Sequence, residues 1–196
     1  MTPVFQPEVF SRNSGRGLCR AFALLSAAVF LLAAVSPAKA WERGSATATL
    51  LKNREYGDTL LRGVRNARSS ILVSCYLFKI TDFPGNIPRR IAEELIEARR
   101  RGVAVTVILE QSRETDDPLN RANRSTATLL SRNDVNVRFD SLRKTTHVKA
   151  VVIDDRYVYL GSHNLTHSAL TRNNELSVLL DSPETARDVR SYLGAI

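Results

Sequence analysis

The chain has 196 residues, with 28 lysine and arginine residues against 20 aspartate and glutamate residues. This length fits one domain of ordinary size, and nine glycines and seven prolines exclude a collagen-like chain. Two cysteines are too few for a four-cysteine zinc site or a disulfide-stapled miniprotein. The formal net charge of +8 favours anionic partners, such as nucleic acid or phospholipid headgroups, without choosing among them.

Residues 1–40 have the layout of a secretory signal. Arginines precede an uncharged run from Ala21 to Val35, and small residues around Lys39 end at Ala40. We predict cleavage after Ala40, export to the periplasm or the medium, membrane contact only during export, and a folded domain over residues 41–196. An uncleaved membrane anchor is the alternative, although the run of 15 residues is shorter than the roughly 20 that span a bilayer core. The remaining thiol would be Cys75, whose apolar neighbours indicate burial.

Strand-like and helix-like patterns alternate in the next part of the chain. The expected elements are a strand over Ala46–Leu51, a helix capped by Asp58, a strand over Ile71–Phe78, a helix over Pro88–Arg101 and a strand over Val103–Leu109. Gly102 ends the second helix. Continuous apolar strands separated by helices indicate right-handed crossovers. We therefore predict an α/β fold with a mixed, largely parallel central sheet flanked by helices.

The stretch from Glu110 to Ala127 is polar, and we expect it to form a mobile surface loop. A third helix is expected to follow and to end at Asn133, before a strand over Val135–Phe139. The sequence shows no internal repeat and no second domain.

A hairpin is predicted after this strand. Two apolar runs, AVVI and YVYL, flank the turn residues Asp154 and Asp155. If the hairpin turns about Asp155, the numbers of paired residues sum to about 310, which sets His147 opposite His163. A helix is expected to begin near Thr166.

Four polar side chains converge at the open end of this hairpin. His147 and Lys149 share one face of their strand, because side chains two residues apart point the same way. Ser162 and Asn164 follow the opposing strand and must lie close to them. Lysine and asparagine donate hydrogen bonds to phosphoryl oxygens, and an imidazole can attack phosphorus. This set predicts a site for phosphoryl chemistry.

The segment HVKAVVID resembles the HxKxxxxD motif of the phospholipase D superfamily, and GSHN followed by RNNE resembles the GSxN and NxE continuation of that motif. The order of elements is similar to that of the short bacterial Nuc-like endonucleases, which carry one such motif per chain and an export signal. The resemblance implies one catalytic domain of phospholipase D-like fold after the signal peptide, and a reaction without metal or cofactor.

The resemblance also implies roles for single residues. His147 would be the nucleophile that forms a phosphohistidine, and Lys149 and Asn164 would stabilise charge on the phosphoryl oxygens with help from Ser162. Glu175 would accept a hydrogen bond from the imidazole and fix its tautomer.

Three further residues need interpretation. Asp154 completes the motif as a catalytic candidate, although its place in the turn indicates support of the hairpin. The leaving group needs a general acid. Because this chain carries one motif, the resemblance implies a homodimer in which two copies of His147 meet. Within the chain, His163 and His167 are the alternative candidates for the general acid. The same two histidines do not predict a zinc site, because no acidic or thiol ligand accompanies them. His163 is expected at the rim of the pocket, in contact with substrate.

Cationic side chains near the motif are expected to bind the substrate. They are Arg113, Arg121 and Arg124 in the polar stretch, with Arg143 and Lys144 just before the motif. We expect an endonuclease acting on DNA, with RNA left open as a substrate, because the short chain has little length for a lipid-binding surface. Hydrolysis of phospholipid headgroups is the alternative, and a nucleic-acid-binding module without turnover is the third interpretation.

Overall fold

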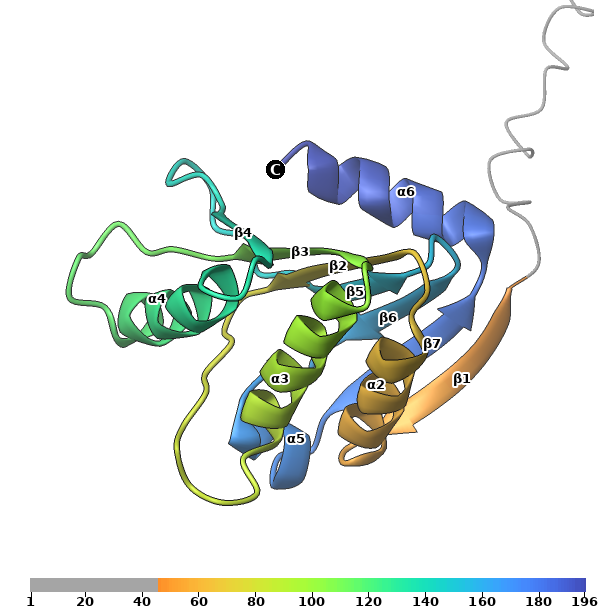
Figure 1. Cartoon of the computed structure of the whole chain (residues 1–196), viewed down its shortest axis with the longest axis horizontal. Coiled ribbons are helices and arrows are strands. Elements are labelled where there is room, and N and C mark those ends of the chain that lie inside the picture. Colours follow the sequence, from red (N-terminus) through yellow and green to blue (C-terminus); the bar gives the residue numbers. More distant parts are fainter. Residues whose placement is uncertain (1–45) are drawn as a thin grey trace, which may run out of the picture. The chain divides into compact units, whose positions relative to one another are not determined.

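The domain is built on a seven-stranded sheet with helices on both faces (Figure 1). The computed structural model describes residues 46–196, so the predicted signal segment lies outside the described residues. The strands are β1 (Thr47–Lys52), β2 (Ser70–Cys75), β3 (Ala104–Leu109), β4 (Asn136–Phe139), β5 (Lys149–Ile153), β6 (Tyr157–Gly161) and β7 (Leu176–Asp181). The helices are α2 (Glu55–Asn66), α3 (Ile87–Arg100), α4 (Pro118–Ser131), α5 (His167–Thr171) and α6 (Pro183–Gly194).

The sheet is mixed, with the strand order β1-β7-β6-β5-β2-β3-β4. β2, β3 and β4 are parallel, as the predicted crossovers through α3 and α4 require. The other four pairings, from β2–β5 to β1–β7, are antiparallel. The mixed sheet is confirmed, but "largely parallel" was wrong for this half of it. β5 and β6 are joined by a hairpin turn, no helix separates β4 from β5, and β1 lies at the far edge beside β7 although α2 connects it to β2.

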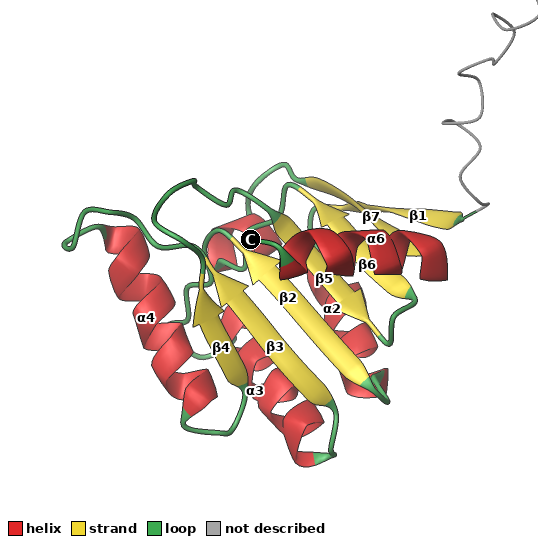
Figure 2. Ribbon diagram, turned by 90° about the horizontal axis from the view of Figure 1, so that it is seen from above, coloured by secondary structure: helices red, strands yellow, loops and turns green. Residues whose placement is uncertain are grey.

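The two faces of the sheet are covered unequally (Figures 1 and 2). Helices α2, α3 and α4 lie on one face and bury the larger core, which includes Leu60, Ile91, Leu95 and Leu130. Helix α6 crosses the other face and buries a smaller cluster with Leu193. Among residues 46–196, no helix is long and apolar enough to cross a membrane.

Helix α4 corrects the prediction of a polar loop over Glu110–Ala127. Asp117 caps this helix, and its buried face carries Asn120, Asn123 and Thr126. Their side chains bond to backbone groups of neighbouring segments: Asn123 donates to the carbonyls of residues 76 and 110, and Thr126 to that of residue 78. The helical spacing was hidden because half of the inward face is polar.

Other element boundaries agree more closely with those predicted from the sequence. Helix α2 begins at Glu55, one turn before the predicted cap at Asp58. Gly102 has a φ of 93°, which explains why α3 ends there. In the hairpin, Ala150 pairs with Leu160, so the predicted sum of 310 is confirmed.

Candidate active site

His147, Lys149, Ser162 and Asn164 lie at the edge of the sheet where β2, β3 and β4 end. Figure 2 shows these three strands ending at one edge. Antiparallel strand β5 begins at the same edge, and β6 ends there at Gly161. The chain then passes from Gly161 to Leu165, whose N–H donates to the carbonyl of Leu77 beyond the end of β2. Because β5 lies between β6 and β2, residues 162–164 cross over its beginning.

His147 and Lys149 form the centre of the site. The Lys149 ammonium nitrogen, Nζ, lies 3.1 and 3.3 Å from the two imidazole nitrogens and 2.9 Å from the backbone oxygen of His147. The Tyr76 ring packs against both, 4.6 Å from the imidazole centre and 5.2 Å from Nζ. Partial burial lowers the pKa of Lys149, while Cys75 and Glu175 act to raise it. The Lys149 ammonium is therefore less well solvated than that of a surface lysine, and it gives up a proton more readily.

Ser162 and Glu175 form a second pair beside this centre. The Ser162 hydroxyl donates to one carboxylate oxygen of Glu175, and the amide of Asn173 donates to the other at 3.0 Å. Asn53 accepts from the Glu175 backbone N–H at 2.9 Å, which fixes the base of the side chain. Among residues 46–196 no hydrogen bond joins Glu175 to His147, so the expected tautomer-fixing contact is absent from this structure, where Lys149 occupies the imidazole nitrogens.

Asn164 lies in the crossing segment with its amide oxygen screened from solvent. Within the described part of the chain this oxygen has no hydrogen-bond partner. A buried carbonyl oxygen without a partner costs free energy. Its place between Gly161 and Leu165 brings the carboxamide to the Lys149 end of β5, as the motif requires.

Two buried carboxyl groups hold the residue before His147. Thr146 donates its backbone N–H to Glu110 at 2.5 Å and its hydroxyl to Asp140. Glu110 and Asp140 follow β3 and β4 directly and are each 4% exposed. Burial raises the pKa of Glu110, the Thr146 N–H lowers it, and Asp140 raises it further. The ends of two parallel strands thus fix the entry into the motif.

His163 is not at the rim of the pocket, and that prediction was wrong. Its side chain is 1% exposed and stacks on Tyr56, with 4.4 Å between ring centres. One ring nitrogen lies 2.7 Å from the Ser177 hydroxyl and the other 2.9 Å from the Asn53 carbonyl oxygen. Exposure alternates along the crossing segment, so His163 points inward while Ser162 is exposed and Asn164 is half-buried. Burial lowers the pKa of His163, so the neutral ring is favoured.

Asp154 lies at the other end of β5, away from the site. Its carboxylate accepts the backbone N–H groups of Arg68, Ser69 and Ser70. The structural role suggested by its turn position is therefore supported, and the catalytic assignment is not, because the length of β5 separates Asp154 from Lys149.

A polar cleft of about 360 Å³ opens beside Tyr76. Among its lining residues are Arg113, Arg143 and Lys144, three of the five predicted substrate-binding cations. Arg113 also donates to the carbonyls of residues 142 and 143, which shapes the wall. Arg121 and Arg124 lie on α4 and do not line this cleft.

Sequence reasoning missed Tyr76 and the Thr146 clamp, formed by Glu110, Asp140 and Thr146. The available signal was position, since Tyr76, Glu110 and Asp140 each follow a parallel strand at the edge that carries the site. Within residues 46–196 no three His, Cys, Asp or Glu side chains form a metal-ligand cluster. Cys75 is buried and unpaired, as predicted, and burial raises its pKa to about 11.

Sequence comparisons relate the chain to two kinds of enzyme. It is 29% identical over 149 residues to cardiolipin synthase B of Escherichia coli (strain K12), which covers 74% of this chain and 34% of that protein. It is 29% identical over 123 residues to a phospholipase D of Rickettsia bellii (strain RML369-C), which covers 63% of this chain and 54% of that protein. The chain thus spans about a third and about half of the lengths of these relatives.

Solved structures share the fold. Nuc of Salmonella typhimurium, a phospholipase D family member, has a TM-score of 0.63 at 24% identity, covering 76% of this chain and 91% of that one. NucT of Helicobacter pylori has a TM-score of 0.59 at 23% identity, covering 76% and 93%. These likenesses confirm the predicted phospholipase D-like fold. The family model "Cardiolipin synthase, PLD-like domain" matches residues 60–196, more than half of the chain, and the protein therefore belongs to the phospholipase D superfamily of phosphodiesterases.

Proposed function

We propose that this protein is an exported endonuclease of low sequence specificity that hydrolyses DNA, with RNA as a second nucleic-acid substrate to be tested. The observation that carries the proposal is the polar cleft beside Tyr76, whose ring packs against His147, with Arg113, Arg143 and Lys144 in its lining. Cationic and polar walls suit a phosphodiester backbone, whereas an acyl chain needs an apolar surface. Export rests on the layout of residues 1–40.

The chemistry begins at the imidazole of His147. One ring nitrogen attacks the phosphorus atom, and the bond from phosphorus to the leaving oxygen breaks as a phosphohistidine forms. Lys149 and the Asn164 amide group donate hydrogen bonds to the phosphoryl oxygens as negative charge develops there. Ser162, held by Glu175, is placed to assist in the same pocket. Water then attacks the phosphohistidine, which releases the phosphate product and restores the imidazole.

The leaving oxygen must receive a proton, and the chain offers one motif histidine. His163 is buried with both ring nitrogens in contact with polar atoms, and His167 lines a different hollow. Both observations support a homodimer in which His147 of a second copy acts as the general acid and later as the base for water. Sedimentation of the processed protein should show a dimer, and an active monomer would overturn this arrangement.

A phospholipid is the second candidate substrate. Matching relatives are called cardiolipin synthase and phospholipase D, and two exposed apolar side chains flank the site. Leu142 is 49% exposed in the lining of the cleft, and Tyr192 is 56% exposed in the hollow beside His147. These two side chains are a small apolar surface beside a polar cleft, so nucleic acid remains the favoured substrate.

One comparison separates the candidates. The processed protein is incubated in EDTA with plasmid DNA and, separately, with phosphatidylcholine vesicles. Nicking of the plasmid supports the proposed nuclease. Release of headgroup with an intact plasmid would replace it with a phospholipase, and retention of DNA on a gel without product would leave a binding module.

A variant of the nucleophile tests the mechanism. His147→Asn keeps a polar side chain but removes the attacking ring, so plasmid nicking should fall below detection. DNA retention on a gel should persist, because the cationic cleft is unchanged. Loss of both retention and nicking together with a lowered Tm would indicate misfolding, and His147→Gln then repeats the measurement. Nicking at the wild-type rate would overturn the phosphohistidine mechanism.

A further inference from the structure

A second cationic hollow lies next to the site, on the side away from the cleft. It has a volume of about 350 Å³, and its lining residues come from the beginnings of α2 and α3 and from the short helix α5. Figure 1 shows these three helices beginning close together. Its lining residues are Arg54, Asp58, Ile87, His167, Thr171 and Arg172. Neither the motif nor the chemistry proposed above uses any of them.

We propose that this hollow binds another phosphate group of the nucleic-acid strand whose reacting phosphate lies at His147. The inference rests on the proposed nuclease function and extends it by assigning a second contact with the substrate. Two guanidinium groups and an imidazole face one carboxylate there, so the local charge balance favours an anion.

The two arginines are placed for phosphate binding. The Nε of Arg54 donates to the carbonyl oxygen of Thr171 at 3.0 Å, which fixes the guanidinium and leaves its two terminal nitrogens for another acceptor. The side chain of Arg172 is exposed and has no hydrogen-bond or ion-pair partner among residues 46–196. A planar guanidinium can donate two parallel hydrogen bonds to a phosphate.

The imidazole of His167 is held in the wall of the hollow. Phe83 packs on it edge to face, with 4.7 Å between ring centres. Its Nδ1 is screened from solvent and has no hydrogen-bond partner within the described chain, so a polar contact across the hollow falls to Nε2. The His167 ring is thus oriented by packing.

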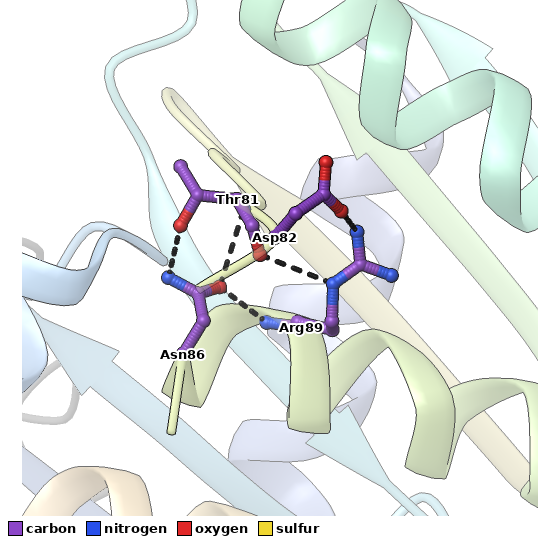
Figure 3. A network of polar contacts seen from close by, with 4 residues as sticks. All are labelled: Thr81, Asp82, Asn86 and Arg89. Atoms are coloured by element: carbon purple, nitrogen blue, oxygen red, sulfur yellow. Dashed lines mark hydrogen bonds and ion pairs between the residues drawn. The ribbon is translucent and has the colours of Figure 1, made fainter. Parts of the chain in front are cut away.

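The loop that carries Phe83 is itself fixed by polar contacts (Figure 3). Asn86 donates to the Thr81 hydroxyl at 2.7 Å and accepts from the Arg89 backbone N–H at 2.9 Å as the cap of α3. Arg89 donates to the Thr81 carbonyl at 3.1 Å and pairs with Asp82. Such a loop is preorganised, which reduces the entropy that ligand binding would cost.

The hollow is continuous with the catalytic residues along the chain. Arg54 follows Asn53, whose side chain accepts the Glu175 N–H. His167 comes three residues after Asn164, and Arg172 three residues before Glu175. Three residues span at most about 10 Å, so a strand bound at the reacting phosphate reaches the hollow within a few nucleotides. The strand would cross His147 from the cleft on the β3–β4 side to this hollow.

The test measures binding in the non-cleaving His147→Asn protein. Fluorescence anisotropy gives the Kd of labelled oligothymidylates of increasing length at several salt concentrations. Arg172→Glu should weaken binding of the longer strands about tenfold and reduce the slope of log K against log salt by about 0.7 or more. A dinucleotide is too short to reach the hollow and should show a much smaller change. Arg172→Gln should show the same length dependence with a smaller loss.

Arg132→Glu is the matched control, because it makes the same change of charge. Arg132 is exposed at the far end of α4, away from the edge that carries the site. Equal loss of affinity and equal change of slope in Arg172→Glu and Arg132→Glu would overturn the proposal, since only net charge would then matter. A loss in Arg172→Glu that is equal at every strand length would also overturn it.

Failure of the nuclease function is separately visible. Hydrolysis of bis(p-nitrophenyl) phosphate by the protein with His147 intact reports the chemistry without a second phosphate. If this diester is hydrolysed and long oligothymidylates bind the two charge variants equally, the proposed phosphate site in the hollow is overturned while the phosphodiesterase activity is supported. If wild-type protein neither binds nor cleaves nucleic acid but releases lipid headgroups, the proposed function fails and the hollow fails with it.

Discussion

The backbone N–H of Thr146 lies 2.5 Å from a carboxylate oxygen of Glu110, one residue before the motif histidine. The same threonine donates its hydroxyl to Asp140. Both carboxyl groups are buried at the ends of parallel strands, so the position of His147 depends on the sheet itself rather than on a surface loop. A rigid support of this kind is what precise placement of a nucleophile requires.

Thr146→Val should therefore damage the reaction more than the binding of substrate. Valine keeps the branched shape but removes the hydroxyl, which leaves the buried Asp140 carboxyl without this donor and costs about 1–3 kcal/mol in stability. Displacement of His147 should lower kcat by about ten- to a hundredfold with little change in KM. Steady-state kinetics and thermal unfolding measure the two effects. Thr128→Val on the exposed side of α4 is the control, and a wild-type kcat in Thr146→Val would contradict the role of the clamp.

The pH dependence of stability should report the buried carboxyl of Glu110. Burial raises its pKa in the folded state, and Asp140 adds to that increase. A carboxyl with a raised folded-state pKa binds its proton more tightly in the folded protein, so the free energy of unfolding falls as pH rises from the unfolded value of about 4.3 through the folded one. Glu110→Gln keeps an oxygen that can accept the Thr146 N–H and cannot ionise. As pH rises through this window, the Tm of Glu110→Gln should fall less than that of the wild type. Identical profiles of Tm against pH would contradict the contribution of the Glu110 carboxyl.

Lys149 should set the alkaline limit of activity. Partial burial lowers its pKa, and the ammonium must stay protonated to donate to phosphoryl oxygens. The rate should fall as pH rises through this lowered pKa, below the usual lysine value of about 10.4. Lys149→Arg stays charged at high pH, so its kcat/KM, although lower because the planar group fits differently, should keep rising or stay level where the wild type declines. A decline at the same pH in both proteins would assign the limit to another group.

The sequence allowed the centre of the site to be predicted because its chemistry depends on local spacing. His147 lies two residues before Lys149, the first residue of β5, and the hairpin register follows from the two apolar runs on either side of the turn. The same reasoning failed at His163, where it relied on nearness to the motif. Burial of that side chain depends on Tyr56 and Asn53, which lie more than a hundred residues earlier in the chain.

The prediction of a loop in place of helix α4 failed for a related reason. Its inward face presents Asn120 and Asn123. A helix cannot be predicted from apolar periodicity where residues on its buried face are polar. Their partners are backbone groups at the ends of β2 and β3, including the carbonyls of Tyr76 and Glu110. Such pairings join distant segments, so the sequence pattern did not reveal them. The parallel half of the sheet was predictable because helices separate its strands.

Asp154 and Asp155 offer a direct test of the structural role given to the last motif residue. Both lie in the turn after β5 with positive φ values, of 54° and 51°, which asparagine also tolerates. The Asp154 carboxylate accepts N–H groups that belong to the loop before β2, whereas Asp155 pairs with Arg190 at 2.5 Å on the surface. The same substitution therefore removes a loop anchor in one case and a solvated ion pair in the other.

Asp154→Asn should lower the free energy of unfolding by about 2 kcal/mol, and Asp155→Asn by less than about 1 kcal/mol. Burial acts to raise the pKa of Asp154, but the donated hydrogen bonds outweigh it and lower the pKa below its usual value. The stability from this carboxylate is therefore complete above the unfolded pKa of about 3.9 and is lost as pH falls through the folded-state value. Urea unfolding at neutral and acidic pH should show the difference between the two variants shrinking with acid. Because the anchor is far from His147, folded Asp154→Asn protein should retain most of its kcat, and a loss as large as that of Thr146→Val would restore Asp154 to the catalytic set.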